Sequence, residues 1–201
     1  NLVPKEVEER VYSTASQDKL ALLLHLLETE CGDRVLVFRN RRDACDKLHR
    51  QLLHYGINSA LLTGDVPQKK RERVLDAFRD ARIRVVVATD VAGRGIHVSN
   101  ISHVVNYDMP YEAEDYVHRI GRTGRAGITG TAISFACEQG AFVVPEIEEY
   151  IQRSLPTTAP DPEALKLPHP RPELSSHVSS DAPARRKSSN NSRRRRRRPR
   201  R

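Results

Sequence analysis

The sequence predicts an α/β domain with a mostly parallel sheet flanked by helices, followed by a disordered basic tail. Two observations support this prediction. Short apolar, β-branched runs alternate with longer stretches in which apolar residues recur at helical spacing, and the alternation continues to Gln152. Strands that alternate with helices in this way pair in parallel through right-handed crossovers. Beyond Leu155 the chain becomes rich in Pro and Ser and then in Arg, a composition that cannot bury a core.

The individual elements follow from these runs in chain order. A strand is expected at 7–14, and the next four leucines stand at the i, i+3, i+4, i+7 spacing of an amphipathic helix: Leu20, Leu23, Leu24 and Leu27. The continuous apolar run at 35–38 is typical of a buried strand. Further strands are expected at 57–62, 85–89, 103–107 and 131–136, and further helices at 43–54, 67–78, 112–120 and 143–152.

The composition divides the chain into three parts. We expect a folded domain at 1–155, a Pro/Ser-rich linker at 156–184 and an Arg-rich tail at 185–201. The tail holds 11 Lys or Arg and no acid, so the rest of the chain carries 23 basic and 26 acidic residues, a formal charge of −3. Long basic runs either stay solvated or bind polyanions, and the second interpretation is the one we favour here.

Three cysteines, Cys31, Cys45 and Cys137, are odd in number and far apart in the sequence. This spacing predicts neither a disulfide framework nor a metal site, and it favours a reduced, cytoplasmic setting. The printed sequence has no apolar stretch near 18 residues and no amino-terminal signal pattern, so no membrane span is expected.

Arginines and glycines recur together in the stretch 118–125, which reads His-Arg-Ile-Gly-Arg-Thr-Gly-Arg. A guanidinium donates two parallel hydrogen bonds to phosphate oxygens, and glycines let the backbone turn sharply enough to aim it. A solvated charged face is the alternative. It explains the glycines poorly, because each glycine in an exposed helix costs about 1 kcal/mol relative to alanine. We therefore predict that all three arginines serve phosphate binding.

A second candidate segment, at 85–96, is a β-branched run that ends in Thr89-Asp90 and continues into Gly93-Arg94-Gly95. Ligands of open α/β sheets bind just beyond the carboxyl ends of strands, and this segment delivers polar residues at that position. Asp90 has an alternative interpretation, because it could cap a helix or pair with an arginine.

Together the two segments resemble motifs V and VI of the DEAD-box RNA helicases, which are ATPases built from two RecA-like domains. The resemblance implies that the chain folds as the second, carboxy-terminal RecA-like domain, with three layers. It implies arginine fingers at Arg122 and Arg125 that act on the γ-phosphate, and a role for His118 in contacting the partner domain. It further implies the following roles: RNA phosphate binding by Thr89, and nucleotide-side roles for Asp90, Arg94 and Gly95. Where the family commonly has a ribose-binding Asp, this chain has His97, so the ribose role is carried over to an imidazole that offers fewer acceptors.

Two further loops resemble RNA-binding segments of the family. One is the Gly-Asp-x-x-Gln-x-x-Arg pattern, which assigns Gly64, Asp65, Gln68 and Arg71 to the RNA backbone. Asp65 and Gln68 could alternatively form a capping box for the helix that follows. The other segment is Phe38-x-Asn40, which assigns Asn40 to RNA. The Thr expected after Asn40 is Arg41 here, which alters the fine contacts of that loop.

The function that the resemblance implies is half of an ATP-dependent RNA helicase. The printed sequence has neither a Gly-x-x-x-x-Gly-Lys-Ser/Thr loop nor an acidic Asp-Glu-Ala-Asp tetrad, so ATP and Mg²⁺ are expected chiefly on an amino-terminal RecA-like domain, and this fragment alone is expected to be inactive. Strings such as Glu-Asp-Tyr-Val-His at 114–118 resemble a bacterial branch of the family that unwinds structured RNA during RNA decay in the degradosome. That branch implies docking onto a segment of the endoribonuclease E scaffold, and RNA as the polyanion for the tail. Two alternatives are a non-catalytic scaffold-docking and RNA-tethering module, and a DNA translocase of the same superfamily.

Overall fold

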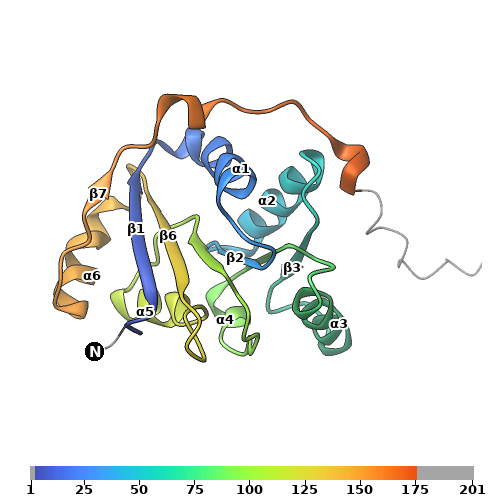
Figure 1. Ribbon diagram of the computed structural model, residues 1–201, viewed down its shortest axis with the longest axis horizontal. Coiled ribbons are helices and arrows are strands. Elements are labelled where there is room, and N and C mark those ends of the chain that lie inside the picture. The colour runs from blue at the N-terminus through green and yellow to red at the C-terminus, as the bar shows by residue number, and fades with distance from the viewer. Residues whose placement is uncertain (1–2, 176–201) are drawn as a thin grey trace, which may run out of the picture.

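The computed structural model describes residues 3–175 and shows one twisted sheet between two layers of helices (Figure 1). The strands are β1 (Val7–Ser13), β2 (Val35–Phe38), β3 (Ser59–Leu62), β4 (Val85–Ala88), β5 (His103–Asn106), β6 (Gly130–Ala136) and β7 (Thr157–Thr158). They are ordered β3-β4-β2-β5-β6-β1-β7, and every pairing is parallel within the described residues. The predicted α/β class with a parallel sheet is confirmed.

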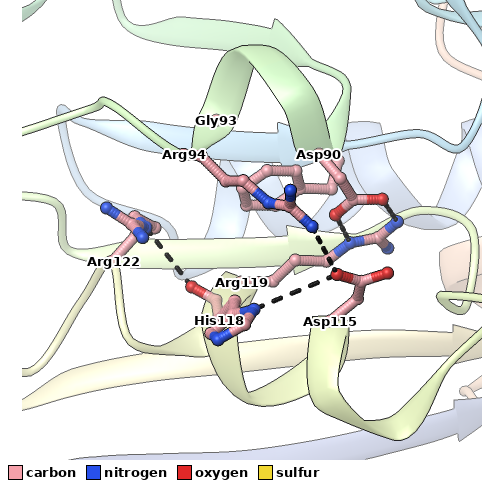
Figure 2. A pocket seen from close by; sticks show the side chains of 8 residues that line it. Asp90, Gly93, Arg94, Asp115, His118, Arg119 and Arg122 are labelled. Carbon is pink, nitrogen blue, oxygen red and sulfur yellow. Dashed lines mark hydrogen bonds and ion pairs between the residues drawn. The ribbon is translucent and has the colours of Figure 1, made fainter.

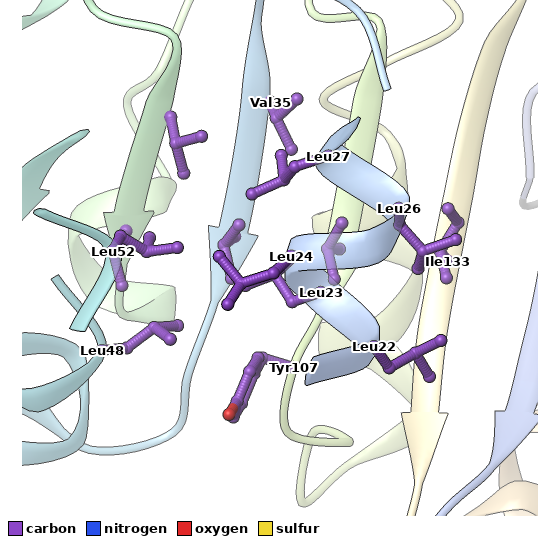
Figure 3. Packing of buried hydrophobic residues seen from close by; sticks show 14 of the residues in the cluster. Leu22, Leu23, Leu24, Leu26, Leu27, Val35, Leu48, Leu52, Tyr107 and Ile133 are labelled. Atoms are coloured by element: carbon purple, nitrogen blue, oxygen red, sulfur yellow. The ribbon is translucent and has the colours of Figure 1, made fainter. Parts of the chain in front are cut away.

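Alternation along β2 explains the two helix layers, because neighbouring side chains of a strand point to opposite faces. Val35 and Val37 pack against α1 (Lys19–Thr29) and α2 (Arg42–His54), whose leucines cover the face that is uppermost in Figure 1 and that Figure 3 shows from close by. Leu36 and Phe38 belong to the opposite cluster with α3 (Gln68–Arg79). Further along the same lower face, α5 (Ala113–Ile120) and α6 (Val144–Ile151) cover β1 and β6. The chain is therefore a three-layer domain, as expected for a RecA-like fold.

A four-residue helix, α4 (Asp90–Gly93), follows β4 directly; it was not among the expected helices, and the cap position is Thr89, not Asp90 as one interpretation of the sequence had it. A single turn of helix has too few residues to show a periodic apolar pattern. Gly93 lies against the ring of Phe38, where a Cβ would stand 2.9 Å from Cζ of the ring. The glycine therefore lets α4 pack directly on the end of β2.

The Pro-rich segment from 156 was expected to be a linker, and its described part is packed against the domain. Strand β7 pairs with β1, and a 3-10 helix at Pro162–Leu165 buries Ala164 among the α1 leucines. The segment then crosses to α2, where the hydroxyl of Ser175 donates to the carbonyl oxygen of Leu53 at 2.8 Å (Figure 1). We call residues 159–175 the strap. Prolines have no backbone N–H to donate and interrupt helices and strands, so a Pro-rich segment shows no periodic pattern in the sequence. The sequence therefore did not indicate these long-range contacts. Residues 176–184 of the expected linker and the Arg-rich tail lie outside the described residues.

No helix within residues 3–175 is both long enough and apolar enough to span a membrane.

Candidate functional site

Polar side chains from four neighbouring strands meet at one edge of the sheet. Asp65 lies just after β3, Asp90 after β4, Asn40 after β2 and Asp108 after β5. Because the four strands are parallel and adjacent, their carboxyl ends share one edge, where ligands of open α/β sheets bind. This edge brings together most of the residues that the sequence assigned to RNA or nucleotide.

Arg119 is the centre of this edge, and it is 1 % exposed. Its Nε and Nη2 donate to the two carboxylate oxygens of Asp90 at 2.6 and 2.7 Å (Figure 2). Its Nη2 also donates to Oδ1 of Asn40 at 2.7 Å, and its Nη1 to the carbonyl oxygen of Asp108 at 2.7 Å. The guanidinium lies over the ring of Phe38, 5.2 Å from the centroid. One buried fork thus ties together the loops after β4, β2 and β5.

The prediction that all three arginines of 118–125 serve phosphate binding is therefore wrong for Arg119. A guanidinium whose donors already bind a carboxylate, an amide oxygen and a carbonyl has no fork left for a phosphate. The alternative interpretation of Asp90 as the partner of an arginine is correct, and Asp90 also begins α4. A signal for Arg119 did exist in the sequence. It stands three residues after Tyr116 and one before Ile120, on the face of α5 that is buried.

Asp108 forms a second ionic centre at the same edge. Its carboxylate accepts two hydrogen bonds from Arg39, at 3.0 and 3.1 Å, one from Lys19 at 3.3 Å and one from the backbone N–H of Asn40 at 3.1 Å. Burial raises the pKa of Asp108, but the Arg39 guanidinium outweighs it and, with Lys19, holds that pKa below its ordinary value. The Arg39 guanidinium also lies 4.6 Å from the ring centroid of Tyr107. Asp108 lies just beyond the end of β5, and no motif in the sequence indicated this role.

Asn40 is held by both centres. Its side-chain oxygen accepts from Arg119, and its Nδ2 donates to the carbonyl oxygen of Met109 at 2.9 Å. Both ends of the amide are therefore engaged within the domain, and the RNA contact assigned to Asn40 stays a prediction.

The loop after α5 carries the two arginines predicted as fingers. Arg122 donates through Nε to the carbonyl oxygen of His118 and through Nη1 to that of Ile96, both at 3.3 Å. Arg125 donates through Nε to the carbonyl oxygen of Gly121 at 2.8 Å. Within residues 3–175 neither guanidinium forms an ion pair. Burial, and then the neighbouring Arg125, lower the pKa of Arg122.

Glycines shape this loop in two different ways. Gly124 and Gly127 have φ values of 65° and 78°, in the left-handed region that favours glycine. Gly121 ends α5 with an ordinary φ of −66°. The threefold recurrence in the sequence therefore marks a helix end followed by a turning loop.

A shallow depression lies beside Arg122 and is lined also by Asp90, Arg94, Asp115 and His118 (Figure 2). Arg94 approaches Asp115 at 3.5 Å, and His118 lies 3.7 Å from Glu114. These pairs are largely exposed, so they add little stability. The depression has a volume of about 10 Å³, which is room for about one water molecule. This depression is therefore too small to enclose a nucleotide by itself.

The predicted RNA residues of the β3 loop do not form the capping box. No side chain caps α3, and Gln68 instead donates to Glu72 at 3.2 Å. Asp65 accepts from the Thr63 hydroxyl at 2.7 Å, a bond that lowers the pKa of Asp65. Arg71 donates to the carbonyl oxygen of Ala92 at 2.7 Å, which joins α3 to α4.

Four of the predicted residues are left open toward the surface. His97 and Gly95 are exposed and follow α4, and Thr89 is partly exposed at its start. Gly64 is exposed, and a Cβ there would meet nothing within 4 Å. Packing within the described domain therefore does not require a glycine at 64.

Residues 18–127 match the model of the helicase conserved C-terminal domain. Among solved structures, the chain is similar to the E. coli DEAD-box protein SrmB, in a complex with regulator of ribonuclease activity A. It is 36% identical, with a TM-score of 0.71, and the match covers 82% of this chain and 96% of that one. The chain belongs to the DEAD-box RNA helicases. It is their carboxy-terminal RecA-like domain, as the resemblance implied.

Other relatives agree with this assignment. The ATP-dependent RNA helicase RhlB of Shewanella sediminis is 51% identical over 84% of this chain, and that of Vibrio cholerae is 48% identical over 83%. The chain spans about two fifths of the length of these DEAD-box relatives, 39% and 38%. S. cerevisiae Dbp5 bound to RNA and ADP BeF3 has a TM-score of 0.67 at 30% identity, covering 79% of this chain and 41% of that one.

Proposed function

We propose that this domain supplies the arginine fingers Arg122 and Arg125 and half of the RNA groove of an ATP-dependent helicase that unwinds structured RNA. The observation that carries the proposal is the pair of guanidiniums on the loop after α5, which bind only backbone carbonyl oxygens within the described residues. Each keeps donors for an anion brought by a second surface. Arginine fingers contribute roughly 10³ to 10⁵ in rate to phosphoryl transfer, because they neutralise charge that develops in the transition state.

The surrounding residues receive roles that fit their positions. His118 is half-exposed beside the fingers, where a partner domain can reach it. Asp90 holds Arg119 and thereby positions the start of α4, while Arg94, Gly95 and His97 face the nucleotide side. We place ATP and Mg²⁺ chiefly on an amino-terminal RecA-like domain, since the printed sequence lacks the phosphate loop and the acidic tetrad. On this proposal the 201-residue chain hydrolyses no ATP by itself.

The RNA groove is assigned to the carboxyl edge of β3, β4 and β2. Gly64, Asp65 and Gln68 lie exposed at the end of β3 and the start of α3, and Arg71 and Thr89 lie partly exposed beside them. An open position at Gly64 leaves space for a sugar–phosphate backbone to approach closely. One Arg71 nitrogen donates to the carbonyl oxygen of Ala92, and the other N–H donors of its guanidinium remain for a phosphate.

The biological setting is proposed from the likeness to RhlB. We assign the helicase to RNA decay in the cytoplasm, within a degradosome in which it docks on a segment of endoribonuclease E. The strap supports a tethering role in addition. It fixes the chain as far as Ser175 on α2, so the sequence that leads to the basic tail starts from a defined point on the domain. A non-catalytic docking and tethering module therefore remains the second candidate.

One experiment tests the catalytic proposal and separates the two candidates. ATP turnover is measured with RNA for the chain alone, and for the chain joined to an amino-terminal RecA-like domain. We expect turnover only in the joined form, reduced at least tens of fold by Arg122→Ala or Arg125→Ala. Arg82→Ala, at an exposed arginine paired with Asp80, is the matched control and should leave turnover unchanged. Unchanged turnover in either finger variant refutes the finger assignment. A joined form without turnover favours the tethering module.

A further inference from the structure

A larger depression lies at the same edge of the sheet, on the side of β5 and β6. It has a volume of about 480 Å³ and is formed by the loops that follow β2, β5 and β6, with the start of α1. Its lining includes the Asp108 centre with Lys19 and Arg39, together with Met109 and Pro110. This volume falls within the usual range of ligand pockets, about 300–1,000 Å³.

Two aromatic side chains stand at this depression, Tyr111 and Phe142, and they are 72% and 74% exposed. No other aromatic side chain within residues 3–175 is as exposed. Tyr150 follows at 38%, and the remaining phenylalanines are buried. Aromatic faces held in water have no role in packing this domain. They are the groups on which bases of single-stranded nucleic acid stack, whatever the sequence.

The order of the strands links the depression to the proposed RNA groove. The groove residues follow β3, β4 and β2, and the loops of the depression follow β2, β5 and β6, which continue the same order. Asn40 belongs to both sets. Neighbouring strands lie about 4.8 Å apart, so a polymer that runs along this edge reaches β6 about 10 Å beyond β2.

We propose that this depression extends the RNA site, and that bases beyond the groove stack on Tyr111 and Phe142. The extension rests on the RNA role proposed above for the loops of β3, β4 and β2. The RNA backbone passes on the side of α2, where Arg41 and Lys47 line the depression.

The charges around the depression indicate whether RNA would be held there by phosphate binding or by base stacking. Arg41 is paired with Asp43 at 2.8 Å, and Lys47 and Glu146 also line the depression, so its exposed rim has two cations and two acids. Asp108 is neutralised by Lys19 and Arg39. Stacking therefore dominates over phosphate binding, and the contribution of this site changes little with salt. Its place beside the groove favours RNA over a peptide as the occupant.

The test uses the full 201-residue chain and two fluorescent oligouridines, a short one of about 5 nucleotides and a long one of about 12, within the range of single-strand site sizes. Tyr111→Ala with Phe142→Ala should weaken binding of the long strand at least about fivefold for each aromatic lost, and leave the short strand unchanged. Tyr111→Phe should retain affinity, since the ring is kept. The basic tail is present in every variant, so its contribution cancels when the dissociation constant of a variant is divided by that of the wild type.

Two controls keep the outcome unambiguous. Leu167→Ala removes an exposed apolar side chain on the strap, and both strands should bind it as before. Arg71→Ala, in the proposed groove, should weaken both strands. If Arg71→Ala acts on both strands while the double aromatic variant acts on neither, the extension is refuted and the groove stands. If Arg71→Ala acts on neither strand, the groove assignment fails and the extension with it. Ultraviolet cross-linking of the long strand to peptides containing Tyr111 or Phe142 would confirm direct contact.

Discussion

Replacing Arg119 by methionine is expected to destabilise the domain strongly. The change keeps a long apolar stem and removes the buried guanidinium, which leaves the Asp90 carboxylate and the Asn40 oxygen without their donor. Removing one partner of a buried ion pair costs about 3–5 kcal/mol in free energy of unfolding. Asp90 keeps some access to water, with a side chain 25% exposed, so we expect the lower part of that range.

The assay is chemical unfolding of the 201-residue chain, followed by circular dichroism. The slope of the free energy of unfolding against denaturant concentration should be the same for the variant and the wild type. Asp90→Asn and the double variant complete a cycle. We expect a coupling free energy of about 1–3 kcal/mol between the two side chains, because they are in direct contact. Arg82→Ala is the control for loss of an exposed arginine. A loss below about 1 kcal/mol for Arg119→Met, the scale of an exposed ion pair, would show that the buried fork is not what holds the three loops together.

Further predictions concern single features of the same surface. Asp108→Asn should lower stability at neutral pH. Because the pKa of Asp108 is depressed in the folded protein, the stability of the wild type should fall as the pH drops below the ordinary value of 3.8. Unfolding curves measured across acidic pH should show that the variant lacks this part of the pH dependence. Gly93→Ala should cost about 1–3 kcal/mol of unfolding free energy, because its Cβ overlaps the ring of Phe38; equal denaturation midpoints would contradict this. His97→Asp in the two-domain enzyme should bind a fluorescent nucleotide equally or more tightly, and a large loss of affinity would give His97 a role of its own. Removal of 185–201 should flatten the salt dependence of RNA binding measured by anisotropy, since each phosphate neutralised adds roughly 0.7 to the log-log slope for single strands; equal slopes would mean that the tail stays solvated.

The sequence predicted the strands and long helices because their signal is local. The run at Val35–Phe38 and the leucines of α1 bury faces that can be counted along the chain. Strand β7 escaped prediction because Thr157–Thr158 has only two residues, and its pairing with β1 joins segments far apart in sequence. The same holds for Ala164, whose burial depends on α1 and not on its Pro-rich neighbours.

The site was predicted less completely, for a physical reason that Arg119 illustrates. A charged side chain is normally exposed, and its burial is tolerated only where partners are supplied. Those partners, Asp90 and Asn40, come from two other strands, and the sequence does not show that they meet. Arg122 and Arg125 stand in the same string of residues but on a loop without carboxylate partners among the described residues. The sequence at 118–125 therefore predicted the same phosphate-binding role for all three arginines, and only the tertiary contacts show that Arg119 differs from the other two.

The buried fork of Arg119 also determines how the domain presents its two proposed surfaces. Its donors bind groups after β4, β2 and β5 at once, so displacing any one of these loops breaks a charge-assisted hydrogen bond. Thr89, assigned to RNA, adjoins Asp90 in this network, and Arg122, assigned to nucleotide, lies three residues after Arg119. The proposed RNA and nucleotide surfaces are therefore both attached to the Arg119 centre. On the proposed function, movement of this domain against a second RecA-like domain would carry both surfaces together, so a change in the nucleotide contact would reach the RNA contact without rearrangement inside the domain.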